Sequence, residues 1–276
     1  MEFLNYVEPA LLGLQAAVAI PIIISTASLM RKGMNGIFPA FFTFAMMGLT
    51  MSDLYGMIFA ILRPDERMPF AADEIAECAM FLLLSAGLEA LAGKRKKWMP
   101  GAFLFAILYM SANIALWIAW SGEWIQDTLF GLPYVYFAYL LFRGLEYVRA
   151  WDVSGERTLA MVTGIVVLLM QALMLFITQE TTKETVNLGS LAIGYGFTAW
   201  LFWKNYRSLR DQSYGEKTLY LSLTLFLWTI LTSYMSDGLY YDISLGINTL
   251  SLPIVWIAVK RLPGDADGAA EGMDDQ

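Results

Sequence analysis

Histidine is absent from the 276 residues of this chain, and cysteine occurs once, at Cys78. Without histidine, the chain cannot form a His-ligated haem or zinc site, a Ser-His-Asp triad, an imidazole proton relay or the phosphoaccepting core of a histidine kinase. A single cysteine excludes an intramolecular disulfide and a CxxC site. We therefore expect no metal ion and no cofactor, and we interpret Cys78 as a small apolar residue of a helix.

Charged residues are also scarce. They make up 16% of the chain, against 58% apolar residues, whereas a soluble domain carries about 25% charged residues. Together with a mean hydropathy of +0.54, this composition indicates an integral membrane protein. The sequence has no phosphate-binding loop, which excludes ATP-driven transport by this chain alone. The expected partner is the lipid bilayer, and no nucleic-acid partner is expected.

Long apolar runs organise almost the whole chain. A membrane-spanning helix needs about 20 mostly apolar residues, and nine segments satisfy this rule. They are residues 9–30, 37–62, 74–93, 99–120, 128–148, 158–178, 187–204, 218–236 and 240–259. The predicted fold class is all-α, a polytopic transmembrane helix bundle of about nine spans within residues 1–262. The acidic segment 263–276 cannot bury apolar area, and we predict a disordered cytoplasmic tail there.

Basic residues decide the orientation of these spans, because cytoplasmic loops retain Lys and Arg. With the N-terminus outside, 15 of the 18 basic residues fall on the cytoplasmic side, and only Arg63, Arg67 and Lys183 remain outside. Removing or adding one span would invert every later connection, so this distribution supports both the count and the orientation. We predict a multi-pass protein of the plasma membrane, with its N-terminus outside and its C-terminus in the cytoplasm.

Acidic residues have the opposite distribution. Thirteen of the 25 acids fall on the predicted outer side, where only three basic residues accompany them. A surface of that sign concentrates cations and repels anions. The alternative is that these acids only keep short loops hydrated.

Asp53 is the first candidate functional residue. It lies in an apolar run about ten residues before Arg63, which places it ~15 Å below the outer interface at 1.5 Å per residue. A carboxyl group near the middle of the bilayer must face the bundle interior, find hydrogen-bond donors or stay protonated. Two interpretations remain open: a binding or protonation site, and a structural acid that joins helices through hydroxyl groups.

A partial repeat of this motif adds two candidates. Residues 51–53 and 235–237 both read Met-Ser-Asp, and a tyrosine, Tyr55 or Tyr240, follows each motif. Asp237 falls at the outer end of its predicted span, so the two motifs are equivalent only if that span is displaced inward. Tyr55 and Asp237 are therefore candidate ligand- or proton-binding residues.

Further acids gather at the predicted outer ends of the spans. Asp73 and Glu77 are four residues apart and so share one face of the third span, and Asp237 and Asp242 flank the start of the last. If these carboxylates converge, they supply oxygen ligands for a cation or an acid/base pair. Alternatively, the two outer arginines neutralise neighbouring acids, and the first-turn acids only stabilise a helix start.

Three classes of function remain open. The first is a small carrier or channel-like protein for a cation, a proton or a neutral solute, with Asp53 as its site. The second is a sensor or assembly subunit without transport, whose basic loops bind a cytoplasmic protein. The third is an intramembrane lipid-modifying enzyme that uses Asp53 with Asp237 or Glu77 as acid and base. A retinal protein is not expected, because the last span has no lysine before Lys260 at its edge.

Overall fold

The computed structural model describes residues 7–31, 37–63, 72–93, 97–148, 154–205, 215–234, 236 and 238–262. Within these ranges the chain forms nine α-helices and no strand, so the predicted all-α bundle is confirmed. The helices are α1 (Val7–Arg31), α2 (Phe38–Leu62), α3 (Ala72–Ala92), α4 (Pro100–Ser121), α5 (Trp124–Tyr147), α6 (Ser154–Met174), α7 (Glu180–Lys204), α9 (Gly215–Ser233) and α10 (Leu239–Lys260). The predicted tail, 263–276, lies outside the described residues.

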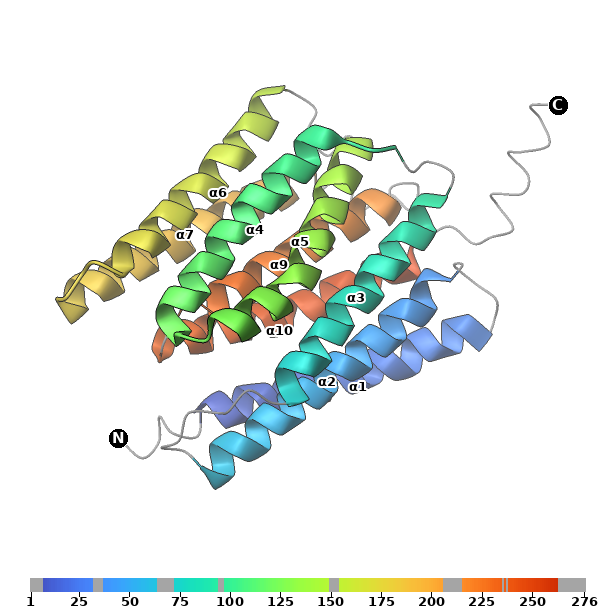
Figure 1. Ribbon diagram of the computed structural model, residues 1–276. Helices are drawn as coiled ribbons and strands as arrows, with labels where there is room; N and C mark the ends of the chain where they lie inside the picture. Colours follow the sequence, from blue (N-terminus) through green and yellow to red (C-terminus); the bar gives the residue numbers. More distant parts are fainter. Residues whose placement is uncertain are drawn as a thin grey trace.

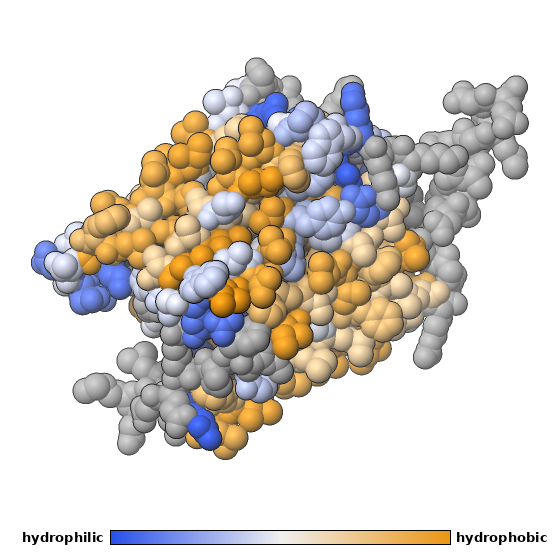
Figure 2. Space-filling view, in the orientation of Figure 1, coloured by the Kyte–Doolittle hydropathy of each residue, from blue (hydrophilic) through white to orange (hydrophobic). Residues whose placement is uncertain are grey.

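Seven of these helices, all except α7 and α9, are long and apolar enough to cross a membrane. Helix α9 packs against α5, α7 and α10 and buries most of its side chains, so it meets protein rather than lipid and tolerates polar residues. Helix α7 begins with two polar turns, residues 180–187. Figure 2 shows apolar side chains along the bundle and hydrophilic ones gathered toward its ends. The protein is a multi-pass membrane protein.

Two rings of helices share a common wall. Helices α1, α2, α3, α5, α9 and α10 each contact the next, and α10 closes the first ring on α1. The second ring runs through α5, α4, α6, α7 and α9, so α5 and α9 belong to both. In Figure 1, α6 and α7 form the flank of the molecule farthest from α1 and α2.

Helices α5 and α7 each approach α9 closely at a glycine. A Cβ atom at Gly144 of α5 would overlap the ring of Tyr220 on α9, and one at Gly194 of α7 would overlap the indole of Trp228 on α9. Small residues allow helix backbones to approach in this way. Glycine at these two positions therefore allows α5 and α7 to pack closely against α9.

The turn between α4 and α5 needs a glycine for a different reason. Gly122 has φ +78°, in the left-handed region, and its N–H donates to the carbonyl of Ile118 at 2.9 Å. The reversal is only two residues long. It places Ser121 beside the first turn of α5, where the Ser121 hydroxyl donates to Asp127 and accepts from the Glu123 N–H.

Candidate functional site

A cavity of about 750 Å³ opens between the helices of the first ring and the end of α4. Its walls come from the first half of α1, the second half of α2, the start of α3, the end of α4, the start of α5, the end of α9 and the start of α10. Because neighbouring helices run in opposite directions, all of these segments lie at the same end of the bundle, the end where α1 begins. We call this space the acid-lined cavity.

Carboxylates dominate the charged groups of this cavity. Seven line it, and the guanidinium of Arg63 is the one basic group among the described lining residues. The seven are Glu8, Asp53, Asp73, Glu74, Glu77, Glu123 and Asp127. A recess with low-dielectric walls focuses the field of such groups and raises the local concentration of cations.

Three hydroxyl groups donate hydrogen bonds to Glu77. Its Oε2 atom accepts hydrogen bonds from the hydroxyls of Tyr134, at 3.1 Å, and Tyr234. Its Oε1 atom accepts from the Ser52 hydroxyl at 3.4 Å. The two tyrosine hydroxyls also contact each other at 2.7 Å. Glu77 thus joins α3 to α2, to α5 and to the residue that follows α9, and it is held in one place at the cavity wall.

A chain of polar side chains forms the floor of the cavity. The Gln15 amide donates to Asn248 Oδ1 at 2.6 Å, and the Asn248 amide donates to the Thr229 hydroxyl at 2.8 Å. Gln15 and Asn248 lie eight and nine residues from the starts of α1 and α10, which puts the floor roughly 12–14 Å from the helix ends. The acid-lined cavity therefore reaches toward the middle of the bundle.

Several buried polar atoms around the cavity have no hydrogen-bond partner. Asp53 is only 4% exposed, and its Oδ2 atom is unpaired; the same holds for Gln15 Oε1 and Asp73 Oδ1. The indole N–H groups of Trp117 and Trp120 are unpaired as well. A buried polar group without a partner costs about 1–3 kcal/mol. The walls of the cavity therefore hold acceptors and donors, buried in this structure, that a ligand reaching them would satisfy.

Aromatic rings form one wall. The ring of Trp117 meets those of Tyr134 and Tyr234 edge to face, with both centroid distances at 5.5 Å. Tyr134 also packs on Phe81, at 4.1 Å. Beyond Phe81 lies a cluster of buried apolar side chains, and Phe81 contacts Phe226 toward the opposite end of the bundle.

The structure brings together three of the six candidate residues. Asp53, Asp73 and Glu77 all line the acid-lined cavity. Tyr55 does not line it, and its ring stacks on Phe59 with a centroid distance of 6.5 Å. Asp242 lies in the first turn of α10, outside the cavity lining. Asp237 lies outside the described residues, so its role stays a prediction.

Sequence reasoning misses the aromatic wall and the floor. Gln15 and Asn248 carry a usable signal, because an amide within an apolar span needs a partner. No such sequence signal distinguishes Trp117, Tyr134 and Tyr234, because aromatic residues are frequent throughout this chain. Which rings face a cavity depends on the packing of α4, α5 and α9.

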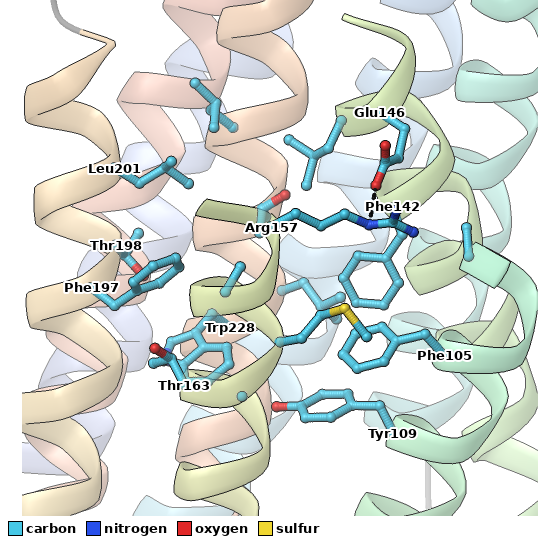
Figure 3. A pocket seen from close by; sticks show the side chains of 18 of the residues that line it. Phe105, Tyr109, Phe142, Glu146, Arg157, Thr163, Phe197, Thr198, Leu201 and Trp228 are labelled. Atoms are coloured by element: carbon cyan, nitrogen blue, oxygen red, sulfur yellow. Dashed lines mark ion pairs between the residues drawn. The ribbon is translucent and has the colours of Figure 1, made fainter. Parts of the chain in front are cut away.

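A second, mostly apolar cavity of about 120 Å³ lies within the second ring (Figure 3). The labelled rings of Phe105, Tyr109 and Phe142 face Phe197 and Trp228 across it. One ion pair lies at its edge, between Arg157 Nε and Glu146 Oε1 at 2.6 Å. We call it the apolar cavity.

A metal site is not indicated by the described residues, in which no three His, Cys, Asp or Glu side chains are grouped to hold an ion. The function of each cavity is therefore inferred from the side chains that line it. Comparison with protein-family models, with curated proteins and with solved structures finds no match for this chain.

Proposed function

We propose that this protein is a membrane carrier for a cation, and that the acid-lined cavity is its binding site. The observation that supports the proposal is the cavity itself: seven carboxylates and one guanidinium line a space that is open at one end and reaches toward mid-bundle. Carboxylates in a membrane interior are costly, and they are typical of ion and substrate pathways.

The interior beyond the cavity supports a carrier rather than an open pore. Below the floor, side chains such as Phe42, Phe81, Leu84 and Phe226 are almost completely buried and pack together. These four side chains offer no ligand atom to a hydrated ion. Transport would therefore alternate between this state and one in which the opposite end opens.

The charge of the two ends supports an outward-facing cavity. Arg143, Arg157, Lys204 and Lys260 lie toward the end opposite the acid-lined cavity. Three ion pairs connect helices there: Arg143 with Glu89, Arg157 with Glu146, and Lys204 with Glu156. By the positive-inside rule, this basic end is cytoplasmic. In the plasma membrane, the cavity then receives solutes from outside the cell.

Uptake into proteoliposomes tests the proposal. We expect time-dependent accumulation of at least one member of a panel of Na⁺, K⁺, Ca²⁺ and organic amines. Accumulation should be lost in Glu77→Gln, which removes the charge and keeps an acceptor at that position. The matched control is Glu184→Gln, because Glu184 is exposed on α7 at the same end but does not line the cavity.

Two results would contradict the proposal, the first against transport and the second against the acid-lined cavity as its site. Binding of a cation without any accumulation would indicate a sensor, the second class considered from the sequence. Accumulation that persists unchanged in Glu77→Gln would separate transport from the acid-lined cavity.

A further inference from the structure

We propose that the acid-lined cavity takes an organic primary ammonium with an aromatic body, and that the ammonium group binds between Asp53 and Glu77. The inference rests on the proposed function of the cavity as a cation site, and it names the class of cation. Its support comes from the size of the cavity, its unpaired polar atoms and its rings.

Size and ligand geometry favour an organic cation over a metal ion. A space of about 750 Å³ matches the pockets that hold small organic molecules, which range over about 300–1,000 Å³. An inorganic ion would need several oxygen ligands drawn together around a point, and the described residues contain no such group. The carboxylates instead are spread along the cavity from seven chain positions.

The unpaired acceptors favour an ammonium that carries N–H groups. Asp53 Oδ2 and Gln15 Oε1 belong to side chains that are 4% and 2% exposed, and neither atom has a donor. Both residues line the deep part of the cavity. A primary ammonium supplies three donors, whereas a quaternary ammonium supplies none. Ser52, the neighbour of Asp53, donates to Glu77, which brings the two acids to the same wall.

The aromatic wall favours a flat apolar body on the ligand. Trp117, Tyr134 and Tyr234 present rings beside the Glu77 carboxylate. Aromatic faces attract cations and stack on other rings. The unpaired indole N–H groups of Trp117 and Trp120 would donate to an oxygen at the far end of the ligand. A ligand with an amine at one end and a phenolic or hydroxyl oxygen at the other would donate to the unpaired acceptors and accept from the indole N–H groups.

One primary ammonium of the protein already lies on a ring of this cavity. The Lys183 Nζ atom lies over the Trp120 ring, 4.5 Å from its centroid. Trp120 lines the cavity in the last turn of α4. The Trp120 ring thus accommodates the chemical group that we propose for the ligand.

Isothermal titration calorimetry on the full chain in lipid nanodiscs tests the inference with four probes. Tyramine has the proposed chemistry; its N,N,N-trimethyl derivative keeps the charge without N–H donors; tyrosol replaces the amine by a hydroxyl; Ca²⁺ is an inorganic cation. We expect tyramine to bind with a dissociation constant below about 1 mM. The trimethyl derivative should bind about tenfold to hundredfold more weakly, because it cannot donate to Asp53 or Gln15.

Variants locate the site. Glu77→Gln should weaken tyramine binding about tenfold or more, and Trp117→Leu about threefold to thirtyfold, through the lost cation–π and stacking contacts. Glu184→Gln should leave binding unchanged. Tyr134→Phe keeps the ring and removes one donor to Glu77, so it provides a second readout if Glu77→Gln does not fold.

The outcomes separate this inference from the proposed function. Tighter binding of the trimethyl derivative or of Ca²⁺ than of tyramine would overturn the primary ammonium and leave a cation carrier standing. Absence of tyramine binding, with accumulation of another cation, would do the same. Tyramine binding that needs Glu77, without accumulation in proteoliposomes, would support the ligand class and overturn the carrier.

Discussion

The two cavities of this protein both have walls from α4, α5 and α9 but differ in almost every other respect. The acid-lined cavity carries seven carboxylates and several polar atoms without partners. The apolar cavity has mostly rings and aliphatic side chains, and its two charged groups, Arg157 and Glu146, pair with each other. The two charged groups of the apolar cavity thus pair with each other, whereas seven carboxylates and one guanidinium are the charged groups among the described residues that line the acid-lined cavity.

The difference shows how one helix serves two environments. Ile230 and Ser233 of α9, and Tyr234 directly after its end, line the acid-lined cavity, while Thr224 and Trp228 of α9 line the apolar one. Hydroxyl groups on both sides bond to their own helix: Thr224 donates to the carbonyl of Tyr220 at 2.7 Å, and Ser233 donates to that of Ile230 at 2.8 Å. The Tyr234 hydroxyl, in contrast, donates to Glu77 on α3. Polar residues therefore mark a site only where they lack such local partners.

Glu77 gives the largest expected effect. Glu77→Leu leaves the hydroxyls of Tyr134, Tyr234 and Ser52 without their acceptor, and we expect a loss of at least about 2 kcal/mol of stability. Glu77→Gln keeps an acceptor, and its loss of stability should be less than half of the loss in Glu77→Leu. Glu146→Leu in the apolar cavity is the comparison, with an expected loss below about 1 kcal/mol, since Arg157 is half exposed. Thermal unfolding in detergent measures all three, and equal losses at Glu77 and Glu146 would remove the contrast.

Gly194 tests how closely α7 approaches α9. Gly194→Ala would overlap the Trp228 indole, and we expect a loss of about 1–3 kcal/mol. The matched change is Gly164→Ala on α6, where the new methyl group would lie 3.5 Å from Tyr109, at ordinary contact distance. That variant should keep or slightly raise the melting temperature. Equal melting temperatures of the two variants would show that α7 and α9 do not approach each other closely at Gly194.

Substitution of Asp53 distinguishes between its two possible roles, ligand binding and a purely structural role. The Oδ2 atom has no protein donor, so Asp53→Asn should change stability by less than about 1 kcal/mol. The same variant should weaken tyramine binding about tenfold, because a charged acceptor is lost. Parallel melting and calorimetric experiments check both statements. A large loss of stability with unchanged binding would make Asp53 a structural residue instead.

Arg157 gives the smallest expected effect. Its side chain is half exposed and pairs with Glu146 at the edge of the apolar cavity. Arg157→Gln should therefore alter stability by no more than about 1 kcal/mol and leave amine uptake intact. Loss of uptake in this variant would show that the apolar cavity also takes part in transport.

The fold could be predicted almost completely from the sequence, because about 20 apolar residues in a row leave the chain few options in a membrane. The nine predicted spans overlap the nine helices of the described residues, and seven of these helices are long and apolar enough to cross a membrane. The site could be predicted in part. A carboxylate in an apolar span has to face the interior, which identified Asp53, and helical spacing placed Asp73 and Glu77 on one face.

The rest of the site depends on how the helices pack, which no local pattern specifies. Tyr134 and Tyr234 are 100 positions apart, and both donate to Glu77 because α3, α5 and α9 meet in the first ring. Tyr55 was a candidate because it follows the Met-Ser-Asp motif, but it lies two residues beyond Asp53. At about 100° per residue, that spacing turns its side chain away from the face that carries Asp53.

Cys78 allows the most direct test of the central claim, that the acid-lined cavity admits cations. It is the only cysteine of the chain and it lines the cavity next to Glu77. Purified protein in nanodiscs would be treated with a cationic and an anionic methanethiosulfonate reagent, each normalised to its rate with a small thiol, and with Cys78→Ser as the blank. The account predicts that the cationic reagent modifies Cys78 at least about tenfold faster, and that Glu77→Gln reduces this ratio. Equal rates, or a faster reaction with the anionic reagent, would contradict it.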